Sequence, residues 1–324
     1  MKLLIRFLLA ALVLAVLPTT EVMAQANRIT GPTGSTSKPP KKKPVKKWKW
    51  KSSYYEGLAA VKDDNEKYGF IDKTGKVVIP CKWNYAGTFS EGLAPVRDAN
   101  GKYGFIDKTG QVVLPCKWKE AWWFYEGLAA VKDDNEKWGY IDKTGQVVIP
   151  CKWYRVGNFS EGLAYASEDV RRYGFIDKTG QVVLPCKWDE AGSFHEGLAK
   201  VMDKNNRKCG YIDKTGQVVL PCKWKKAEDF HEGLAPVKDD NGKWGFIDKT
   251  GKVVIPCKWE GAGGFSEGLA VVEDDNWKLG YIDKTGKVVI PCKWDNAWPF
   301  KGGLGTVWGT NGWHKIDKTG KIIE

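Results

Sequence analysis

The side chains best suited to metal binding or nucleophilic chemistry are eight cysteines and three histidines. Seven of the cysteines follow a proline and recur at a nearly constant interval: Cys81, Cys116, Cys151, Cys186, Cys222, Cys257 and Cys292. Equivalent positions in stacked units lie about 10 Å apart, whereas a disulfide requires Cα atoms within about 7 Å. We therefore expect unpaired, buried, small apolar residues. We expect no zinc or other metal site, because no CxxC or HxxxH spacing occurs.

The histidines do not form a catalytic pattern either. His195 and His231 share one position, directly before a glutamate, where other copies carry Ser90, Ser160 or Ser266. A residue that alternates with serine at a turn is expected to be solvated. A serine–histidine–aspartate triad needs unlike residues that converge, and near-identical units do not supply them. We expect no enzyme activity and no cofactor. A hydrolase with carboxylates around a ring centre would need an asymmetric site, which only the degenerate last copy offers.

Two recurring acidic turns could be mistaken for ion sites. The turn from Asp72 to Gly75 offers one carboxylate in four residues, too few oxygens for calcium, and suits a tight hairpin instead. The Glu56-Gly57 pair recurs in every full copy and could form a ring of carboxylates. We expect each glutamate to pair with a lysine of the adjacent unit, such as Lys82, for about 0–1 kcal/mol.

One repeated stretch positions all these residues. It reads YGFIDKTGKVVIPCKW at 68–83, returns every 35 residues with one step of 36, and ends in a degenerate copy at 313–324. A fixed period of this length predicts a repeat architecture in which neighbouring units share a core. Three apolar or β-branched segments per copy predict three antiparallel strands. Pro80 should end the third strand, and a connector should follow from Cys81 to Phe89.

A glycine lies inside the second predicted strand of each full copy, as Gly69 does in the first. Glycine weakens a strand, so its recurrence there indicates either close approach of a neighbour or a β-bulge. We expect a Trp or Phe ring of an adjacent strand over this glycine. The bulge is an equally good interpretation.

The two ends of the repeat region complement each other. The segment from Trp48 to Tyr55 matches the tail of a unit, and the segment from Ile322 to Glu324 matches part of a head. Seven full units and this split unit make eight. We predict an all-β fold of tandem three-stranded antiparallel β-meander repeats, and favour a closed propeller-like ring over an open β-solenoid. In a closed ring the N-terminal piece would join the last unit.

The repeat resembles the bacterial WG, or KWG, repeats, named for an aromatic-glycine pair. Matching pairs are Trp138-Gly139, Trp244-Gly245 and their Tyr-Gly equivalents, together with the IDKTG, PCKW and EGLA segments. The resemblance covers about residues 48–324. It implies a β-rich array and carries over no catalytic residues. Three copies depart from the pair: Cys209 and Leu279 replace the aromatic residue, and Trp313-His314 replaces the whole pair.

The region before the repeats differs in composition. Residues 1–26 have a basic start, an apolar core and small residues before two cleavage candidates, as a secretory signal peptide does. Residues 27–47 form a basic linker rich in proline and lysine, and residues 48–324 the repeat domain. We expect an exported protein, located in the periplasm, on the cell surface or in the medium.

The basic charge is confined to this N-terminal region. Of the net charge of +12, residues 1–26 carry +1 and residues 27–51 carry +9, which leaves +2 for the repeats. A nucleic-acid partner is not expected for an exported chain with this charge distribution. The tail could contact an anionic envelope surface or act as a solvated spacer. Its candidate contact residues are Lys41, Lys42, Lys43, Lys46 and Lys47.

Two segments vary between otherwise similar copies: the turn at 63–67 and the residues after the Lys-Trp pair, with their equivalents. Variable loops on a constant scaffold are where recognition usually occurs. Aromatic side chains of these segments could stack on sugars, anchor a protein or only complete the packing between units. We predict a non-catalytic, exported repeat scaffold that binds proteins or cell-envelope components. The alternative is a carbohydrate-binding module. The candidate ligand-binding residues are Trp122, Trp123, Tyr154, Trp277 and Trp298.

Overall fold

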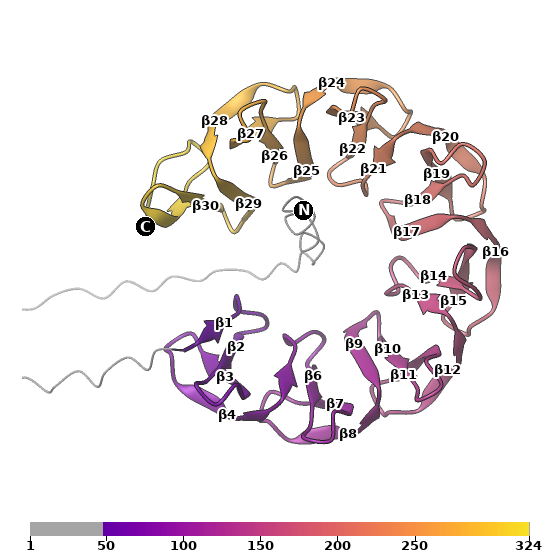
Figure 1. Cartoon of the computed structure of the whole chain (residues 1–324), viewed down its shortest axis with the longest axis vertical. Helices are drawn as coiled ribbons and strands as arrows, with labels where there is room; N and C mark the ends of the chain where they lie inside the picture. The colour runs from indigo at the N-terminus through magenta and orange to yellow at the C-terminus, as the bar shows by residue number, and fades with distance from the viewer. Residues whose placement is uncertain (1–47, 324) are drawn as a thin grey trace, which may run out of the picture. The chain divides into compact units, whose positions relative to one another are not determined.

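Each repeat folds into a small antiparallel sheet, and eight sheets follow one another around a ring (Figure 1). The computed structural model describes residues 48–323. Seven of the sheets have four strands and the eighth has three. The architecture is an eight-bladed β-propeller, so the all-β prediction and the choice of a ring over an open solenoid are confirmed.

The blades follow the chain in order. Within each blade the first strand lies nearest the centre of the ring and the last lies at its rim (Figure 1). Blades 1 to 4 consist of β1 (Trp50–Lys51), β2 (Leu58–Lys62), β3 (Tyr68–Asp72) and β4 (Val77–Trp83); β5 (Tyr85–Ala86), β6 (Ala94–Arg97), β7 (Tyr103–Ile106) and β8 (Val112–Trp118); β9 (Glu120–Tyr125), β10 (Leu128–Lys132), β11 (Trp138–Asp142) and β12 (Val147–Trp153); and β13 (Arg155–Val156), β14 (Leu163–Ser167), β15 (Tyr173–Asp177) and β16 (Val182–Trp188).

Blades 5 to 8 consist of β17 (Glu190–His195), β18 (Leu198–Met202), β19 (Cys209–Asp213) and β20 (Val218–Trp224); β21 (Lys226–Ala227), β22 (Leu234–Lys238), β23 (Trp244–Asp248) and β24 (Val253–Trp259); β25 (Gly261–Ser266), β26 (Leu269–Glu273), β27 (Leu279–Asp283) and β28 (Val288–Trp294); and β29 (Asn296–Lys301), β30 (Leu304–Gly309) and β31 (Gly312–Ile316). Within residues 48–323 no helix is long and apolar enough to cross a membrane.

The structure adds a fourth strand to the three predicted ones. The segment expected as a connector contains the innermost strand of the next blade, such as β5. The expectation that Pro80 ends its strand was wrong, because β4 continues through it to Trp83. The outermost strand has a free edge, so a proline there need not remove a ladder hydrogen bond.

The glycine inside the third strand lies at a bulge, as one of the two interpretations predicted. The pairing of β3 with β4 shifts register between Tyr68 and Phe70, on either side of Gly69. A Cβ atom at Gly69 would lie 2.5 Å from the carbonyl oxygen of Ile79 and 2.7 Å from the amide nitrogen of Cys81. The expected aromatic neighbour was therefore wrong, because the close neighbour is the backbone of the outer strand.

The hydrophobic core lies between blades rather than within them. The cluster between blades 2 and 3 joins Phe105 and Trp118 of one blade to Phe124, Val131 and Ile141 of the next. The rings of Phe105 and Phe124 lie 4.9 Å apart between centroids, and equivalent aromatic pairs recur around the ring. A blade therefore buries its apolar faces only against its neighbours.

The first and last blades are not joined by strand pairing. The N-terminal strand β1 pairs with β2 in blade 1, so the expectation that the N-terminal piece joins the last unit was wrong. In blade 1, Trp48 and Tyr54 pack against the buried Ala59, Val61 and Ile71. A cation–π contact spans this junction, with Lys301 Nζ lying 5.3 Å from the centre of the Tyr55 ring.

Candidate functional site

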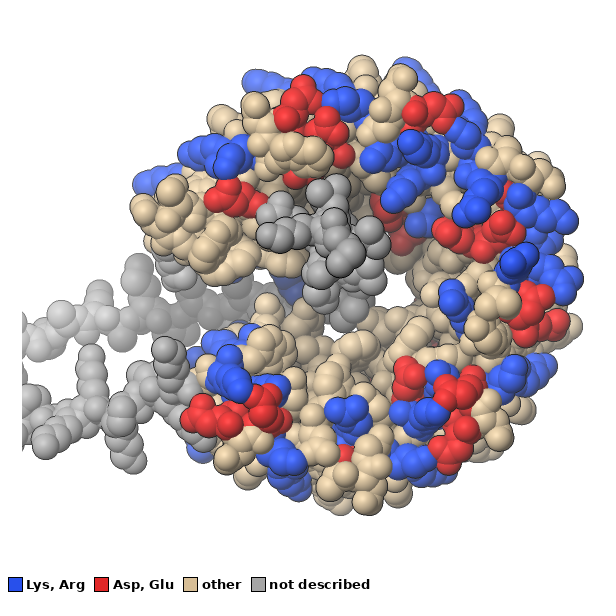
Figure 2. Space-filling view, in the orientation of Figure 1, with Lys and Arg blue, Asp and Glu red and all other residues tan. Residues whose placement is uncertain are grey.

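The turns of each blade emerge at two opposite ends. Because the strands are antiparallel, the Glu-Gly turn before the second strand and the Asp-Lys-Thr-Gly turn after the third lie at one end, called here the constant end. The turn between the second and third strands and the connection to the next blade lie at the other, called the variable end. The first variable segment of each copy thus lies at this end, and the second begins there and continues into the innermost strand of the next blade. Acidic and basic side chains are interspersed around the ring (Figure 2).

The constant end is an inter-blade network. The carboxylate of Glu161 accepts a hydrogen bond from the backbone N–H of Gly197 at 3.1 Å and pairs with Lys214 at 3.1 Å. Burial alone would raise the pKa of Glu161, but Lys214 and the Gly197 N–H lower it. The same arrangement joins each blade to the next from Glu56 to Glu267.

The expected pairing of this glutamate with a lysine of the adjacent unit is confirmed, but the lysine named as an example was wrong. The partner comes from the Asp-Lys-Thr-Gly turn, as Lys108 does for Glu56 at 2.9 Å. Lys82 instead places its Nζ 4.9 Å from the centre of the Trp83 ring. Since the network repeats around the ring, it stabilises blade stacking and distinguishes no single ligand site.

The variable end carries an asymmetric groove between blades 3 and 4. Its cavity of about 470 Å³ is lined by Lys132 and Trp138, at the facing ends of β10 and β11, by Glu136 of the turn between them, and by Tyr154 and Arg155, where the chain enters blade 4. Ligand pockets in proteins commonly measure about 300–1,000 Å³. The groove is therefore large enough for a small ligand or one unit of a polymer.

The charges inside the groove are partly paired. Lys132 Nζ lies 3.0 Å from Glu120 and 2.6 Å from Glu136, and 5.6 Å from the centre of the Trp138 ring. The Tyr154 ring is 39% exposed. Lys137 Nζ and the Arg155 guanidinium carbon each lie 5.8 Å from its centre. An exposed ring with two cations nearby can stack on a flat ligand, and the cations can attract its negative group.

The structure brings together two of the five predicted ligand-binding residues. The half-buried Trp122 packs against Trp138, with 4.7 Å between ring centres, beside the groove lined by Tyr154. Trp123 is half-buried, and its indole nitrogen has no hydrogen-bond partner among the described residues. Trp277 is exposed in the variable turn of blade 7, and Trp298 lies on the innermost strand of blade 8. The predicted tail residues Lys41, Lys42, Lys43, Lys46 and Lys47 lie outside the described residues.

The sequence prediction missed a cluster of ionisable side chains on the inner strands of blades 5 and 6. His195 Nε2 lies 3.4 Å from the Asp229 carboxylate, and the rings of His195 and His231 are 5.4 Å apart. Lys200 Nζ lies 3.6 Å from Glu228. Both histidines are half-buried, so they are less solvated than the sequence suggested. Copy-to-copy comparison could have found this cluster, because Asp229 and Lys200 stand where most other copies have small or apolar residues.

Burial and neighbouring charges act in opposite directions in this cluster. Burial lowers the pKa of His231, and the nearby His195 lowers it further. Burial would also lower the pKa of Lys200, but the Glu228 and Asp229 carboxylates raise it above its ordinary value. The lysine is therefore cationic and His231 neutral at pH 7.

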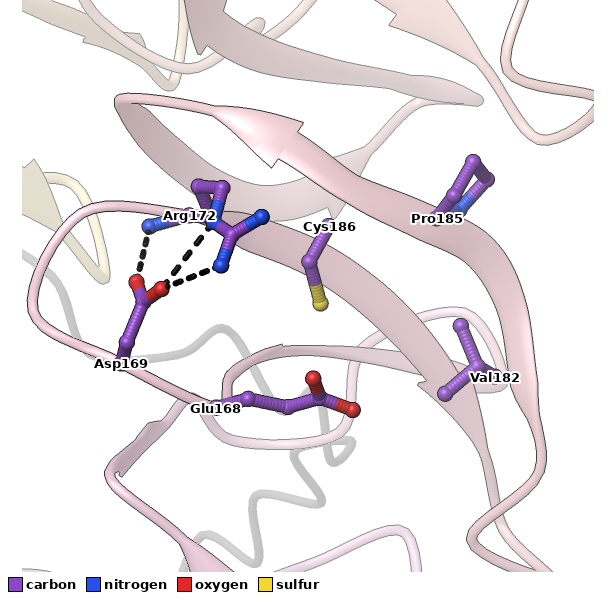
Figure 3. Close-up of a pocket in the computed structure, with 6 residues that line it drawn as sticks. All are labelled: Glu168, Asp169, Arg172, Val182, Pro185 and Cys186. Carbon is purple, nitrogen blue, oxygen red and sulfur yellow. Dashed lines mark hydrogen bonds and ion pairs between the residues drawn. The ribbon is translucent and has the colours of Figure 1, made fainter.

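A second, smaller cavity of about 270 Å³ lies within blade 4 (Figure 3). Asp169 accepts hydrogen bonds from Arg172 Nε and Nη2 at 3.0 and 2.8 Å, so these opposite charges are compensated. Burial and the Glu168 carboxylate raise the pKa of the Cys186 thiol, which donates to the carbonyl of Ala166 at 3.7 Å. A protonated thiol is a poor nucleophile, so this cavity is a weaker candidate than the groove.

The repeated cysteines are half-buried rather than buried, which corrects the prediction. Burial raises the thiol pKa of Cys116, Cys151, Cys222 and Cys292 to about 11. Within the described residues no group of three or more His, Cys, Asp or Glu side chains is placed to hold a metal ion.

Sequence and structure comparisons agree with this architecture. A family model described as WG containing repeat matches seven consecutive segments: 68–103, 103–137, 138–169, 173–207, 210–244, 244–276 and 280–307. No curated protein shows significant similarity to the chain. A solved eukaryotic initiation factor aligns with a TM-score of 0.62 and 13% identity, covering 89% of this chain and 90% of that one. The computationally designed Ika8 protein aligns with a TM-score of 0.50 and 11% identity, covering 83% and 93%.

At these identities the solved structures are similar in fold alone. The family matches cover most of residues 68–307 and repeat in phase with the blades. The chain therefore belongs to the WG-containing repeat family.

Proposed function

We propose that this protein is a non-catalytic binding scaffold that recognises its partner with the variable end of the propeller. The observation that carries the proposal is that both variable segments of the sequence reach one end of the propeller, whereas the uniform Glu-Gly and Asp-Lys-Thr-Gly turns lie at the other. Recognition commonly uses loops that vary on a rigid scaffold. The groove beside Tyr154 is the proposed centre of contact.

We further propose that the protein is exported and that its partner is a protein or another component of the cell envelope. The support is the composition of residues 1–26, with their basic start and apolar core, and the lysine-rich segment that follows. Cell fractionation and the mass of the mature protein test export. A mature chain that retains residues 1–26 in the cytoplasm would contradict it.

A carbohydrate-binding module is the second candidate. The packed pair Trp122–Trp138 and the exposed Tyr154 favour it, because aromatic rings at a groove can stack on sugar rings. This candidate uses the same end of the ring, so the two differ in ligand rather than in surface.

A pull-down from envelope extract with the full chain tests the proposed surface. We expect Tyr154→Ala or Trp277→Ala, both at the variable end, to reduce capture of a specific partner. Lys73→Ala is the matched control, since this exposed lysine lies in the constant turn of blade 1. The proposal would be contradicted if Lys73→Ala reduced capture of the partner equally, or if both variable-end variants captured the partner as well as the natural protein does. A chain lacking residues 27–47 tests the basic segment separately, because this deletion leaves Trp48 and β1 in blade 1.

A further inference from the structure

We infer that the groove between blades 3 and 4 binds a saccharide carrying an anionic group, with the sugar ring stacked on Tyr154 and the anion held by Lys137 and Arg155. The inference rests on the proposed function, because it names the ligand class of that same surface. It depends on two cations that no carboxylate compensates, Lys137 and Arg155, which lie beside the exposed Tyr154.

The last residue of the variable turn is a cation in blades 1 to 7, and in five of them an acidic side chain compensates it. Lys67 of blade 1 instead donates to the side-chain oxygen of Asn84. Lys102 pairs with Asp134, and Lys208 pairs with Asp240. Lys243 lies 2.6 Å from Glu260 and 2.7 Å from Asp275. Lys278 lies 2.5 Å from Asp295. Arg172 is held by Asp169 of its own turn.

Lys137 of blade 3 has no such partner among the described residues. The position that supplies Glu260 and Asp295 in later blades is occupied here by Tyr154. The other source of an acid is the turn of the next blade, where Asp169 already binds Arg172 at 2.8 Å. The ammonium group therefore lies beside the Tyr154 ring without a carboxylate.

Arg155 is the second uncompensated cation. Its Nη1 donates to the hydroxyl of Tyr173 at 3.1 Å, and no carboxylate among residues 48–323 lies within ion-pair distance of it. A guanidinium has five N–H donors, so most of them are left for a ligand. Its planar arrangement suits two-point binding of a carboxylate, sulfate or phosphate.

The acids that line or flank the groove do not neutralise these cations. Glu136 is bound by Lys132 at 2.6 Å and by Lys119, and Glu120 is bound by Lys132 at 3.0 Å. Two positive charges without a carboxylate partner thus remain near one exposed ring. This charge distribution favours an anionic ligand over a neutral or cationic one.

The close spacing of ring and cations favours an acidic sugar over an acidic peptide. Both cations lie 5.8 Å from the centre of the Tyr154 ring. An acidic sugar carries its C–H face and its anion on one rigid ring, so a single unit can stack and form the ion pair. An aspartate or glutamate side chain has a flexible stem and offers no comparable face. The cavity of about 470 Å³ accommodates such a unit.

A glycan array followed by calorimetry on the full-length protein tests the inference. The array carries carboxylated, sulfated, phosphorylated and neutral glycans, which distinguishes the possible anions. For carboxylated ligands the calorimetric probe is trigalacturonic acid, with a neutral galactose trisaccharide for comparison. We expect acidic glycans alone to bind, and binding to weaken as salt rises. Arg155→Ala and Tyr154→Ala should each reduce affinity at least about tenfold.

Lys102→Ala is the matched control, because it removes the equivalent lysine where Asp134 compensates it. It should change affinity less than about twofold, whereas Lys137→Ala should weaken binding severalfold. Equal binding of neutral glycans, equal binding of polyglutamate, or no effect of Arg155→Ala would overturn the inference. If no glycan binds but envelope capture still depends on Tyr154, the saccharide inference fails and the proposed function stands.

Discussion

At the scale of single residues, the lack of a Cβ atom at one glycine allows the outer strand to approach the third strand of the blade closely. Each of the seven full repeats places a glycine where the outer backbone approaches most closely. At Gly139 an added Cβ would lie 2.4 Å from the carbonyl oxygen of Ile149. The neighbour is main chain, so no side-chain rotation can relieve the clash. Glycine is therefore required at this position by the close packing of two backbones, and not by the conformation of a turn.

We therefore expect Gly139→Ala to destabilise the protein by about 2–3 kcal/mol, the range of a badly overpacked position. Gly263→Ala is the control, because its Cβ would meet nothing nearer than 4.0 Å. Gly263→Ala should change the free energy of unfolding by no more than about 0.5 kcal/mol. Urea unfolding followed by tryptophan fluorescence measures both. Similar midpoints for the two variants would refute the close-approach argument.

His231 makes stability depend on pH. Burial first, and then His195, hold its pKa below the ordinary 6.5, although Asp229, Glu196 and Glu232 act in the opposite direction. The unfolded chain therefore binds this proton more readily than the folded chain. The contribution of His231 to the free energy of unfolding should fall as the pH drops from about 6.5 toward the lowered pKa. Above about pH 6.5 this contribution should remain constant.

The test compares urea midpoints at pH 7.5 and 5.5 for the natural protein and His231→Ser, the residue that other copies carry. The serine variant should lose less stability on acidification. Both proteins retain every other ionisable side chain, so the difference between the two proteins reports the contribution of His231. An equal or larger loss in the variant would show that His231 does not carry the dependence.

These residues also mark the limit of what the sequence could predict. The aromatic nature of Trp122 and Tyr154 was visible in the sequence, but their proximity at one groove required the blade register. The contact of His195 with Asp229 joins two blades and could not be inferred from a pattern within one copy. Copy-specific chemistry therefore appears only once the ring arranges the copies in space.

At the scale of the element, the Glu-Gly turn combines an unfavourable backbone conformation with an inter-blade contact. Glu196 has φ of 53° and Gly197 has φ of 87°, which is the pattern of a two-residue type I′ hairpin. Glycine or asparagine would suit the first position better. The glutamate instead accepts the Gly233 N–H at 3.1 Å and pairs with Lys249 at 3.0 Å.

This conflict predicts an unusual order of stabilities at Glu196. Alanine and glycine both remove the inter-blade bonds, but only glycine relieves the left-handed backbone. We therefore expect Glu196→Gly to be more stable than Glu196→Ala by about 1 kcal/mol, with both below the natural protein. Thermal unfolding ranks the three proteins. The reverse order of the two variants would show that the backbone conformation carries no cost there.

Turn chemistry was the most predictable part of each element. The Asp-Lys-Thr-Gly hairpin forms as expected, with Asp72 Oδ1 accepting from the backbone N–H of Thr74 at 2.9 Å and of Lys76 at 3.0 Å. The innermost strand was not predicted, because pairs such as Lys226–Ala227 are too short to show a strand period. The outer strand was ended too early, since proline is excluded from central strands but not from free edges.

At the scale of the whole molecule, blade 8 differs from the other blades on the side turned away from blade 7. Thr306 and Lys315 occupy the paired positions that hold Val271 and Tyr281 in blade 7. The lysine donates to the threonine hydroxyl at 2.6 Å. Gly302 stands where other blades have the bridging glutamate. Blade 8 is thus a polar cap on the stack of blades, as terminal units of repeat proteins commonly are.

The period of the repeat predicted the number of units and their shared core. It did not predict that blade 8 would carry a polar outer face. The phase match between the two chain ends suggested that one unit is split and closes the ring. That inference treated all copies as equivalent. The substitutions in blade 8 break the equivalence, and only the register of β30 with β31 shows which face they occupy.

The cap leads to a prediction about association. Removing residues 295–324 would uncover the face of blade 7 that contains Leu269, Val271, Tyr281, Ile290 and Trp294, now buried against blade 8. Burial of a large apolar side chain contributes about 1.5–3 kcal/mol, so the exposed face should drive self-association and lower the melting temperature. Light scattering coupled to size exclusion measures the association.

The matched control removes only residues 318–324, which leaves β29, β30 and β31 in place over blade 7. That protein should remain in the same association state as the full chain, because the apolar face stays covered. A monomeric product of the larger truncation, with an unchanged melting temperature, would mean that the blades do not depend on their neighbours. Association of both truncated proteins would instead show that residues 318–324 are needed to cover the apolar face of blade 7.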